Sequence, residues 1–190
     1  MALSFNGVSI PQTGNIRFNG QALKRYIHNG TVVWQQITDV NVMNPAIYTV
    51  VGSSDGATAG TGGLSCPGAD KYNRAICIRF NTGDHTKLYL YGQLGKGNFS
   101  FSRVRCGAVD PKLYQSLQQG PDEGVGKEYL NYHTGWLPTE SYGPWTIITE
   151  TFNRTITVPK NSFVYLTLQG ANTSEYGGAT PYLSSIVLKA

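Results

Sequence analysis

A chain of 190 residues suits one domain, or one domain with a small appendage, and is long enough to bury a core without disulfides. Charged residues make up only 14%, and the formal charge of +4 is spread along the chain, so we expect no nucleic-acid partner. No segment approaches the roughly 18 apolar residues of a membrane span, whereas 23 Gly and 12 Tyr with few charges are typical of an all-β protein.

Three Asn-Gly pairs separate short strand-like runs at the start of the chain: Asn6-Gly7, Asn19-Gly20 and Asn29-Gly30. A two-residue type I′ hairpin turn needs a positive φ at both central residues, which Gly adopts freely and Asn more readily than most residues. Residues 1–37 are therefore predicted to form a small β-meander, and residues 38–190 a separate domain.

Most later segments alternate apolar and polar residues, which indicates half-buried strands. The expected strands are 46–51, 74–80, 87–91, 98–105, 145–150, 151–158, 162–169 and 183–189. Residues 36–44, 52–68 and 120–144 are expected to be joints or loops, and Asp110-Pro111 is expected to begin one short helix. Many short strands with almost no helix predict an antiparallel β-sandwich or jelly roll.

Signals for catalysis or metal binding are weak. Residues 52–56 match the G-x-S-x-G pattern, but the following ATAGTGG cannot begin the helix that a nucleophile elbow needs. Cys66, Cys77 and Cys106 form no ligand spacing and are expected to be reduced, partly buried thiols. We therefore predict no catalytic residue, no metal site and no cofactor.

An aromatic loop is the strongest binding-site candidate. Residues 129–145 read YLNYHTGWLPTESYGPW, and aromatic faces with polar edges are surfaces on which sugar rings stack and protein partners dock. The candidate carbohydrate-binding residues are Tyr129, Tyr132, His133, Trp136, Tyr142 and Trp145. The alternative is that this segment folds over the sandwich and buries its rings as a satellite core. The sequence leaves both interpretations open.

The start of the chain resembles a motif in tail and virion structural proteins of bacteriophages and prophages of gut bacteria. The matching residues are Phe18-Asn19-Gly20, Lys24-Arg25, His28-Asn29-Gly30 and Val33-Trp34. The resemblance covers about residues 1–36. It implies that the meander is an attachment or assembly element in which Lys24, Arg25 and Trp34 contact other virion or tail subunits.

The resemblance also implies a function for the whole chain. We expect a non-enzymatic tail-appendage or receptor-binding protein, often a homotrimer in such appendages, whose sandwich recognises bacterial surface carbohydrate. The first residues lack a secretory signal, which fits a virion protein made in the bacterial host cytoplasm.

Two alternatives stay open. The first alternative is a stand-alone carbohydrate-binding module or lectin, in which the aromatic loop alone binds the ligand. A polysaccharide-degrading enzyme would need two carboxyl groups flanking one bond, for which the candidates are Asp122, Glu123 and Glu140. The chain has only 11 acidic residues, so a pair of catalytic carboxyl groups has few candidates and the enzyme is the less favoured hypothesis.

Overall fold

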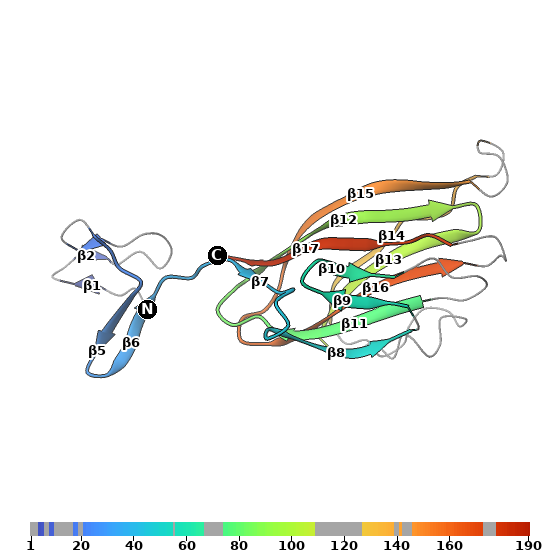
Figure 1. Cartoon of the computed structure of the whole chain (residues 1–190). Helices are drawn as coiled ribbons and strands as arrows, with labels where there is room; N and C mark the ends of the chain where they lie inside the picture. The colour runs from blue at the N-terminus through green and yellow to red at the C-terminus, as the bar shows by residue number, and fades with distance from the viewer. Residues whose placement is uncertain are drawn as a thin grey trace. The chain divides into compact units, whose positions relative to one another are not determined.

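A computed structural model describes residues 4–5, 8–9, 17–18, 21–54, 56–66, 74–108, 127–138, 141, 146–172 and 178–190. The described residues form β-strands joined by turns and loops, and every strand pair among them is antiparallel (Figure 1). The predicted all-β, antiparallel sandwich is confirmed. The helix expected from Asp110-Pro111 lies outside the described residues.

The chain divides into two compact units, residues 1–39 with Ala190 and residues 40–189. The first unit contains three two-stranded sheets: β1 (Ser4–Phe5) with β2 (Val8–Ser9), β3 (Arg17–Phe18) with β4 (Gln21–Ala22), and β5 (Arg25–His28) with β6 (Thr31–Gln35). Asn29 and Gly30 have φ of 48° and 76°, so the hairpin predicted from this Asn-Gly pair is confirmed. Lys24 and Arg25 are exposed, and the Trp34 side chain lies outside the described part.

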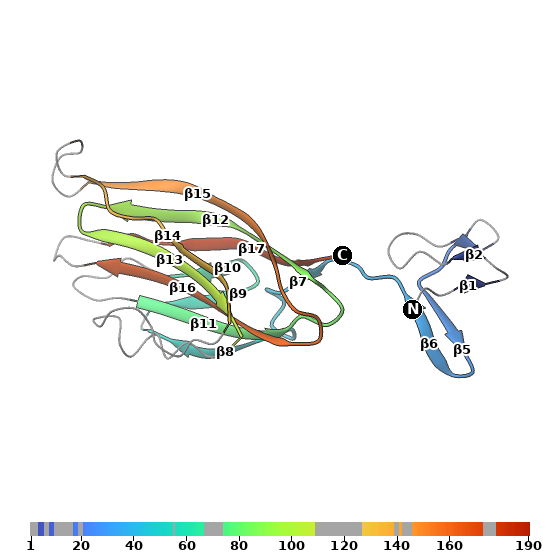
Figure 2. The same ribbon diagram turned by 180° about the vertical axis from the view of Figure 1, so that it is seen from behind.

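The second unit consists of two sheets, which Figures 1 and 2 show as stacked layers from opposite sides. The first runs in the order β15 (Ile147–Thr157), β12 (Lys87–Gly97), β17 (Tyr182–Lys189), β10 (Gly63–Ser65) and β9 (Thr58–Gly60), with β7 (Val40–Asn41) also paired to β17. The second runs β14 (Glu128–His133), β13 (Ser100–Gly107), β16 (Phe163–Asn172), β11 (Arg74–Asn81) and β8 (Tyr48–Ser53). Strands β14 and β15 are therefore edge strands of the two sheets.

The core fills the space between the sheets and follows the two-residue period of their strands. Successive side chains of a strand point to opposite faces, so every second residue faces the core. Ile76, Ile78 and Phe80 share the core face, as predicted for residues 74–80. Ala75 and Cys77 between them are also fully buried, so this strand is not half-buried as expected. The partners of Ile76, Ile78 and Phe80 in the same cluster include Leu88, Leu90, Leu94, Val104, Phe152, Val164, Leu166, Leu168, Leu183, Ile186 and Leu188.

Four expectations about strand boundaries were wrong. Residues 36–44, expected to be a joint, include β7. Residues 52–68, expected to be a loop, include the end of β8 and the strands β9 and β10, and residues 120–144 include β14. The two strands expected at 145–150 and 151–158 form one strand, β15. Gly weakens strand propensity and polar edge strands alternate weakly, so pairing with a neighbouring strand decided these segments.

The three cysteines are buried and free, as the sequence predicts for reduced thiols. Burial raises the pKa of the Cys66 and Cys106 thiols to about 12. Both therefore stay protonated at neutral pH, and Cys66 Sγ donates a hydrogen bond to the carbonyl oxygen of Leu168 at 3.1 Å. They serve as small core residues.

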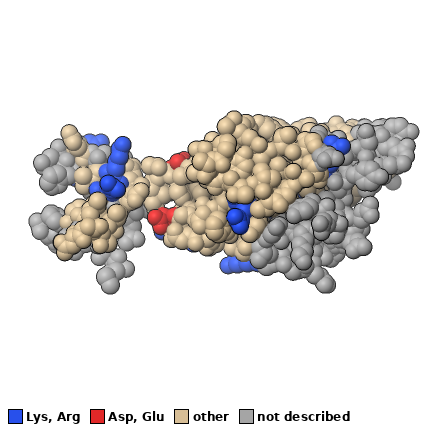
Figure 3. Space-filling view, turned by 60° about the horizontal axis from the view of Figure 1, so that its bottom comes forward, with Lys and Arg blue, Asp and Glu red and all other residues tan. Residues whose placement is uncertain are grey.

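Uncharged side chains dominate the described surface. Figure 3 shows one face on which Lys and Arg lie in small separate groups and most described atoms belong to neither acids nor these bases. No helix among the described residues is long and apolar enough to cross a membrane. A surface of this kind leaves recognition to local clusters of side chains rather than to a broad electrostatic field.

Candidate functional site

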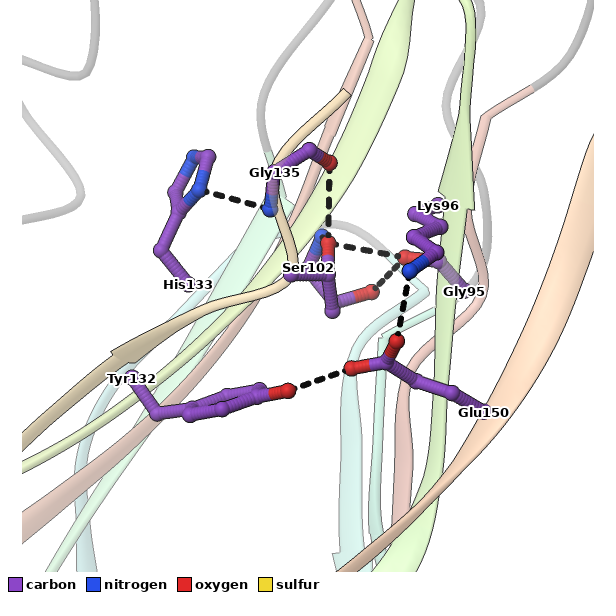
Figure 4. A network of polar contacts seen from close by, with 8 residues as sticks. Gly95, Lys96, Ser102, Tyr132, His133, Gly135 and Glu150 are labelled. Atoms are coloured by element: carbon purple, nitrogen blue, oxygen red, sulfur yellow. Dashed lines mark hydrogen bonds and ion pairs between the residues drawn. The ribbon is translucent and has the colours of Figure 1, made fainter. Parts of the chain in front are cut away.

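Tyr132 on β14 links the edges of the two sheets. Its hydroxyl donates a hydrogen bond to Glu150 Oε1 on β15 at 2.5 Å, and Lys96 Nζ on β12 lies 2.9 Å from Glu150 Oε2 (Figure 4). The Tyr132 ring lies 5.0 Å from the Phe152 ring, centroid to centroid, and the Arg154 guanidinium lies 5.4 Å from the Tyr132 ring centroid. Tyr132 is half-buried and packs against the core, so the structure places it as a connector between sheets.

The surrounding charges and hydrogen bonds keep the Tyr132 phenol a hydrogen-bond donor and the Glu150 carboxylate an acceptor. The hydrogen bond to Glu150 and burial raise the pKa of the Tyr132 phenol. Burial alone would raise the pKa of Glu150, but hydrogen bonds from Tyr132 and Lys96 and the charges of Lys96 and Arg154 together lower it. At neutral pH the phenol is protonated and the carboxylate is ionised.

We expect the stability of the sandwich to fall in acid partly through Glu150. Because its pKa is lowered from an ordinary 4.5 in the folded state, its contribution is present above about pH 4.5 and is lost as pH falls through the folded-state pKa. In urea unfolding measured from pH 7 to pH 3, Glu150→Gln should be less stable than the wild type at pH 7, and the gap should close in acid. A gap independent of pH would contradict this assignment.

The outer face of the five-stranded sheet carries a second group of side chains. On β13, Val104 and Cys106 point into the core, so Phe101, Arg103 and Arg105 point to the opposite face. Strand register pairs Arg103 with His133 and Arg105 with Asn131 on β14. Residues from these two neighbouring strands therefore share one surface.

A chain of polar contacts runs along this surface. Arg105 Nε donates to Glu128 Oε1 at 2.8 Å, and its Nη2 also contacts that oxygen. Asn131 Nδ2 donates to Glu128 Oε2 at 3.3 Å, and Arg103 Nε donates to Asn131 Oδ1 at 3.0 Å. Arg105 is only 5% exposed, and a buried guanidinium requires such a carboxylate partner. Arg103 and Asn131 are positioned by this chain.

Three rings, Phe101, His133 and Trp136, gather where the polar chain ends, and we call them the aromatic cluster. The ring centroids of Phe101 and His133 are 4.2 Å apart, and Trp136 meets Phe101 edge to face at 5.0 Å. Trp136 is 45% exposed, His133 is exposed and Phe101 is half-buried. The cluster therefore offers an exposed indole that packs against a second ring in a T-shaped contact.

His133 is uncharged in this setting. Partial desolvation of the ring and the neighbouring charge of Arg103 lower the pKa of His133 from 6.5. The N–H of Gly135 donates to His133 Nδ1 at 2.9 Å (Figure 4). Since Nδ1 accepts this bond, the neutral ring carries its proton on Nε2. Gly135 has a φ of +74°, which the turn after β14 requires and which a side chain would disfavour.

The segment that carries Trp136 is tied to the β12–β13 hairpin. Thr134 and Ser102 exchange bonds, from Thr134 N to Ser102 O and from Ser102 N to Thr134 Oγ1, each at 3.1 Å. Leu137, only 6% exposed, donates from its N to the carbonyl oxygen of Gly97 at 3.0 Å. These anchors on both sides hold Trp136 in place, which lowers the entropy that a ligand must remove on binding.

The six predicted binding residues are divided by the structure. His133 and Trp136 meet in the aromatic cluster, whereas Tyr129 and Tyr132 are half-buried against the core. Tyr142 and Trp145 lie outside the described residues, as do Asp122, Glu123 and Glu140. Sequence reasoning did not select Phe101, Arg103, Arg105 or Glu128, although the alternation of NFSFSRVR already placed the first three on one face.

Two further candidates from the sequence are the G-x-S-x-G segment and a metal site. Within the G-x-S-x-G segment, Ser54 Oγ accepts a hydrogen bond from the N of Ala75 at 3.0 Å, and strand β9 follows where a nucleophile elbow has a helix. In the part of the chain that the structure describes, no group of three or more His, Cys, Asp or Glu is placed to hold a metal ion.

No model of a known protein family matches the sequence. No curated protein sequence matches it either. Among solved structures, the chain is similar to a family 29 carbohydrate-binding module from Piromyces equi, with a TM-score of 0.35, 12% identity, and coverage of 80% of this chain and 90% of that chain. It is also similar to a module with specific mannan recognition (TM-score 0.38, 11% identity, 81% and 97% covered) and to the K2 cleaved adhesin domain of Lys-gingipain (TM-score 0.38, 17% identity, 80% and 88% covered).

Proposed function

We propose that this protein is a non-catalytic glycan-binding module whose site is the aromatic cluster with Arg103 and Asn131. The observation that carries the proposal is the exposed Trp136, backed by Phe101 and anchored on both sides. Sugar rings present flat faces of C–H groups that pack on an indole, and their hydroxyl groups need planar polar partners at the ring edge. His133 supplies such a group within the cluster, and Arg103 and Asn131 follow it along the same face of the sheet.

Two other exposed aromatic side chains in the described part lack this combination. Phe163 is 53% exposed, but the Arg79 guanidinium lies 4.8 Å from its ring centroid. Tyr182 is 37% exposed, and its hydroxyl donates to the carbonyl oxygen of Gly62. Trp136 therefore has the most favourable surroundings for stacking a sugar ring among these three.

The test is a glycan and bacterial-envelope array probed with the wild type and with Trp136→Ala. We expect the variant to lose at least about tenfold in affinity, because central aromatic anchors carry much of the energy of a binding site. Phe163→Ala is the matched control, since Phe163 is an aromatic side chain, 53% exposed, at the opposite end of the same sheet. Equal binding by Trp136→Ala and the wild type would show that the site lies outside the aromatic cluster, provided that circular dichroism shows both proteins to be folded.

A bacteriophage tail-appendage role is the second candidate, and we propose it as the setting in which the module acts. It is supported by the N-terminal resemblance and by a separate first unit whose β5–β6 hairpin exposes Ile27 (44%) and Val32 (47%). Such apolar residues on a short sheet suit contact with another virion subunit or with further copies of the chain in a homotrimer.

We expect light scattering of the full chain to give the mass of a trimer. Ile27→Asp should shift that mass toward a monomer, because a charge at a shared apolar contact is costly to bury. Lys160→Asp, an exposed change in the second unit, should leave the mass unchanged. A monomeric wild type at micromolar concentration would count against the homotrimer and leave glycan binding to be judged by the array.

A further inference from the structure

The outer face of the six-stranded sheet carries two tyrosines on its central strand β12. Leu88 and Leu90 of this strand belong to the core, so the alternate residues Tyr89, Tyr91 and Gln93 point to the outer face. Figures 1 and 2 show β12 between β15 and β17 from opposite sides. The neighbours of the three outward side chains therefore come from these two strands.

Strand register places one residue of β15 and one of β17 beside each of them. The rows across the three strands are Thr155, Tyr89 and Val187, then Asn153, Tyr91 and Ser185, then Thr151, Gln93 and Tyr182. We call these nine residues the tyrosine platform. Five of them are exposed and the other four are half-buried, so the platform is open to solvent.

The tyrosine platform is longer than a single sugar ring. A strand rises by about 3.3 Å per residue, and neighbouring strands lie about 4.8 Å apart. The step from Tyr89 to Gln93 therefore covers about 13 Å, and the three strands cover about 10 Å across. Every residue of the three rows belongs to the described part of the chain.

Polar groups at the centre of the platform are available to a ligand. In the part of the chain that the structure describes, the hydroxyls of Tyr89 and Tyr91 and the side-chain amide of Asn153 make no hydrogen bond. At one end, Gln93 Nε2 donates to Thr151 Oγ1 at 3.4 Å, and the Tyr182 hydroxyl donates to the carbonyl oxygen of Gly62. Contacts within the protein thus orient the end of the platform and leave its centre free to bind.

The composition of the platform favours an uncharged glycan over other partners. None of its nine residues is ionised at neutral pH, so it offers no charge complementarity to an acidic or basic ligand. Val187 is the only aliphatic side chain among them, whereas the core of a protein interface is mostly apolar. Sugar rings pack their C–H faces on aromatic rings, and their hydroxyl groups pair with phenol, amide and hydroxyl groups.

We propose that the tyrosine platform is a second glycan site, which holds an uncharged, extended oligosaccharide along β12. One sugar ring packs on Tyr91, and its hydroxyl groups bond to the amide of Asn153. The site goes beyond the proposed function and does not depend on it, because it lies on the other sheet from the aromatic cluster. A chain with one site on each sheet would bind a polysaccharide with added avidity.

The Trp136→Ala background separates the two sites, because this substitution removes the anchor of the aromatic cluster. Cellohexaose, mannohexaose and laminarihexaose are the uncharged probes for calorimetric titration of the full chain. We expect at least one of them to bind Trp136→Ala. Adding Tyr91→Ala should then weaken that binding by at least about tenfold, and adding Asn153→Ala instead should weaken it by about threefold to tenfold.

Controls check the chemistry and the folding of the variants. Phe163→Ala removes an exposed aromatic ring from the other sheet and should leave the affinity unchanged. Tyr91→Phe keeps the ring and should keep most of the binding, so the site can be tested even where thermal melting shows that Tyr91→Ala is unfolded. Because both partners are neutral, raising salt from about 50 to 500 mM should not weaken the binding.

The failure of this site is distinguishable from the failure of the aromatic cluster. Loss of all binding in Trp136→Ala alone would overturn the platform and leave the proposed function standing, as would binding that survives both added substitutions. Loss of binding in Tyr91→Ala with no change in Trp136→Ala would support the platform and contradict the cluster. A lower mass of Tyr91→Ala by light scattering without sugar would show a contact between copies of the chain and overturn the platform.

Discussion

Phe152→Ala should destabilise the second unit by about 3–5 kcal/mol, the usual cost of removing a buried Phe side chain. Phe152 is 2% exposed and belongs to the core cluster on β15. Its ring supports Tyr132 at 5.0 Å, and the Arg154 guanidinium lies 5.8 Å from its centroid. The substitution therefore removes core volume and also the support for the connector between the sheets.

Urea unfolding followed by Trp fluorescence measures this loss. Phe163→Ala is the control, because the same atoms are removed from a side chain that is 53% exposed, and its cost should stay below about 1 kcal/mol, mainly from the cation–π contact with Arg79. A loss for Phe152→Ala no larger than that of the control would contradict the packing described for this edge.

Gly92→Ala should be nearly as damaging, at about 3 kcal/mol or more, through collision with the backbone rather than a cavity. Gly92 lies at a register shift between β12 and β17. A Cβ atom there would lie 2.0 Å from the carbonyl oxygen of Tyr182 and 2.7 Å from the Cα of Leu183. Each strand also pairs with another strand on its other side, so moving either one away would break hydrogen bonds there.

Gly60→Ala provides the matched comparison on an outer strand of the same sheet. No atom lies within 4 Å of a Cβ built at Gly60, so this substitution should change the free energy of unfolding by less than about 0.5 kcal/mol. Thermal melts of the two variants give the difference directly. Similar melting temperatures would show that β12 and β17 can separate at the register shift without cost.

Much of the fold could be predicted from local sequence patterns. Alternation in RAICIRF predicted the buried face of β11, and Asn29-Gly30 predicted the β5–β6 turn with its positive φ values. Both features are local, because they depend on the two-residue side-chain period of a strand and on the φ that a single residue tolerates. The Gly-containing strands β9 and β10 were missed because their residues have weak strand propensity, and because β10 is held in the sheet by β17, which is distant in sequence.

The candidate site was likewise predictable from the sequence only in part. The sequence by itself determined an all-β chain with aromatic residues crowded into 129–145, and alternation predicted a strand at 98–105. Only the tertiary structure decided that His133 and Trp136 meet Phe101 while Tyr132 turns toward Glu150 and the core. The physical reason is register, because a shift of one residue between β13 and β14 would exchange the two faces of β14. That register is set by pairing between residues 21 to 30 positions apart in the sequence.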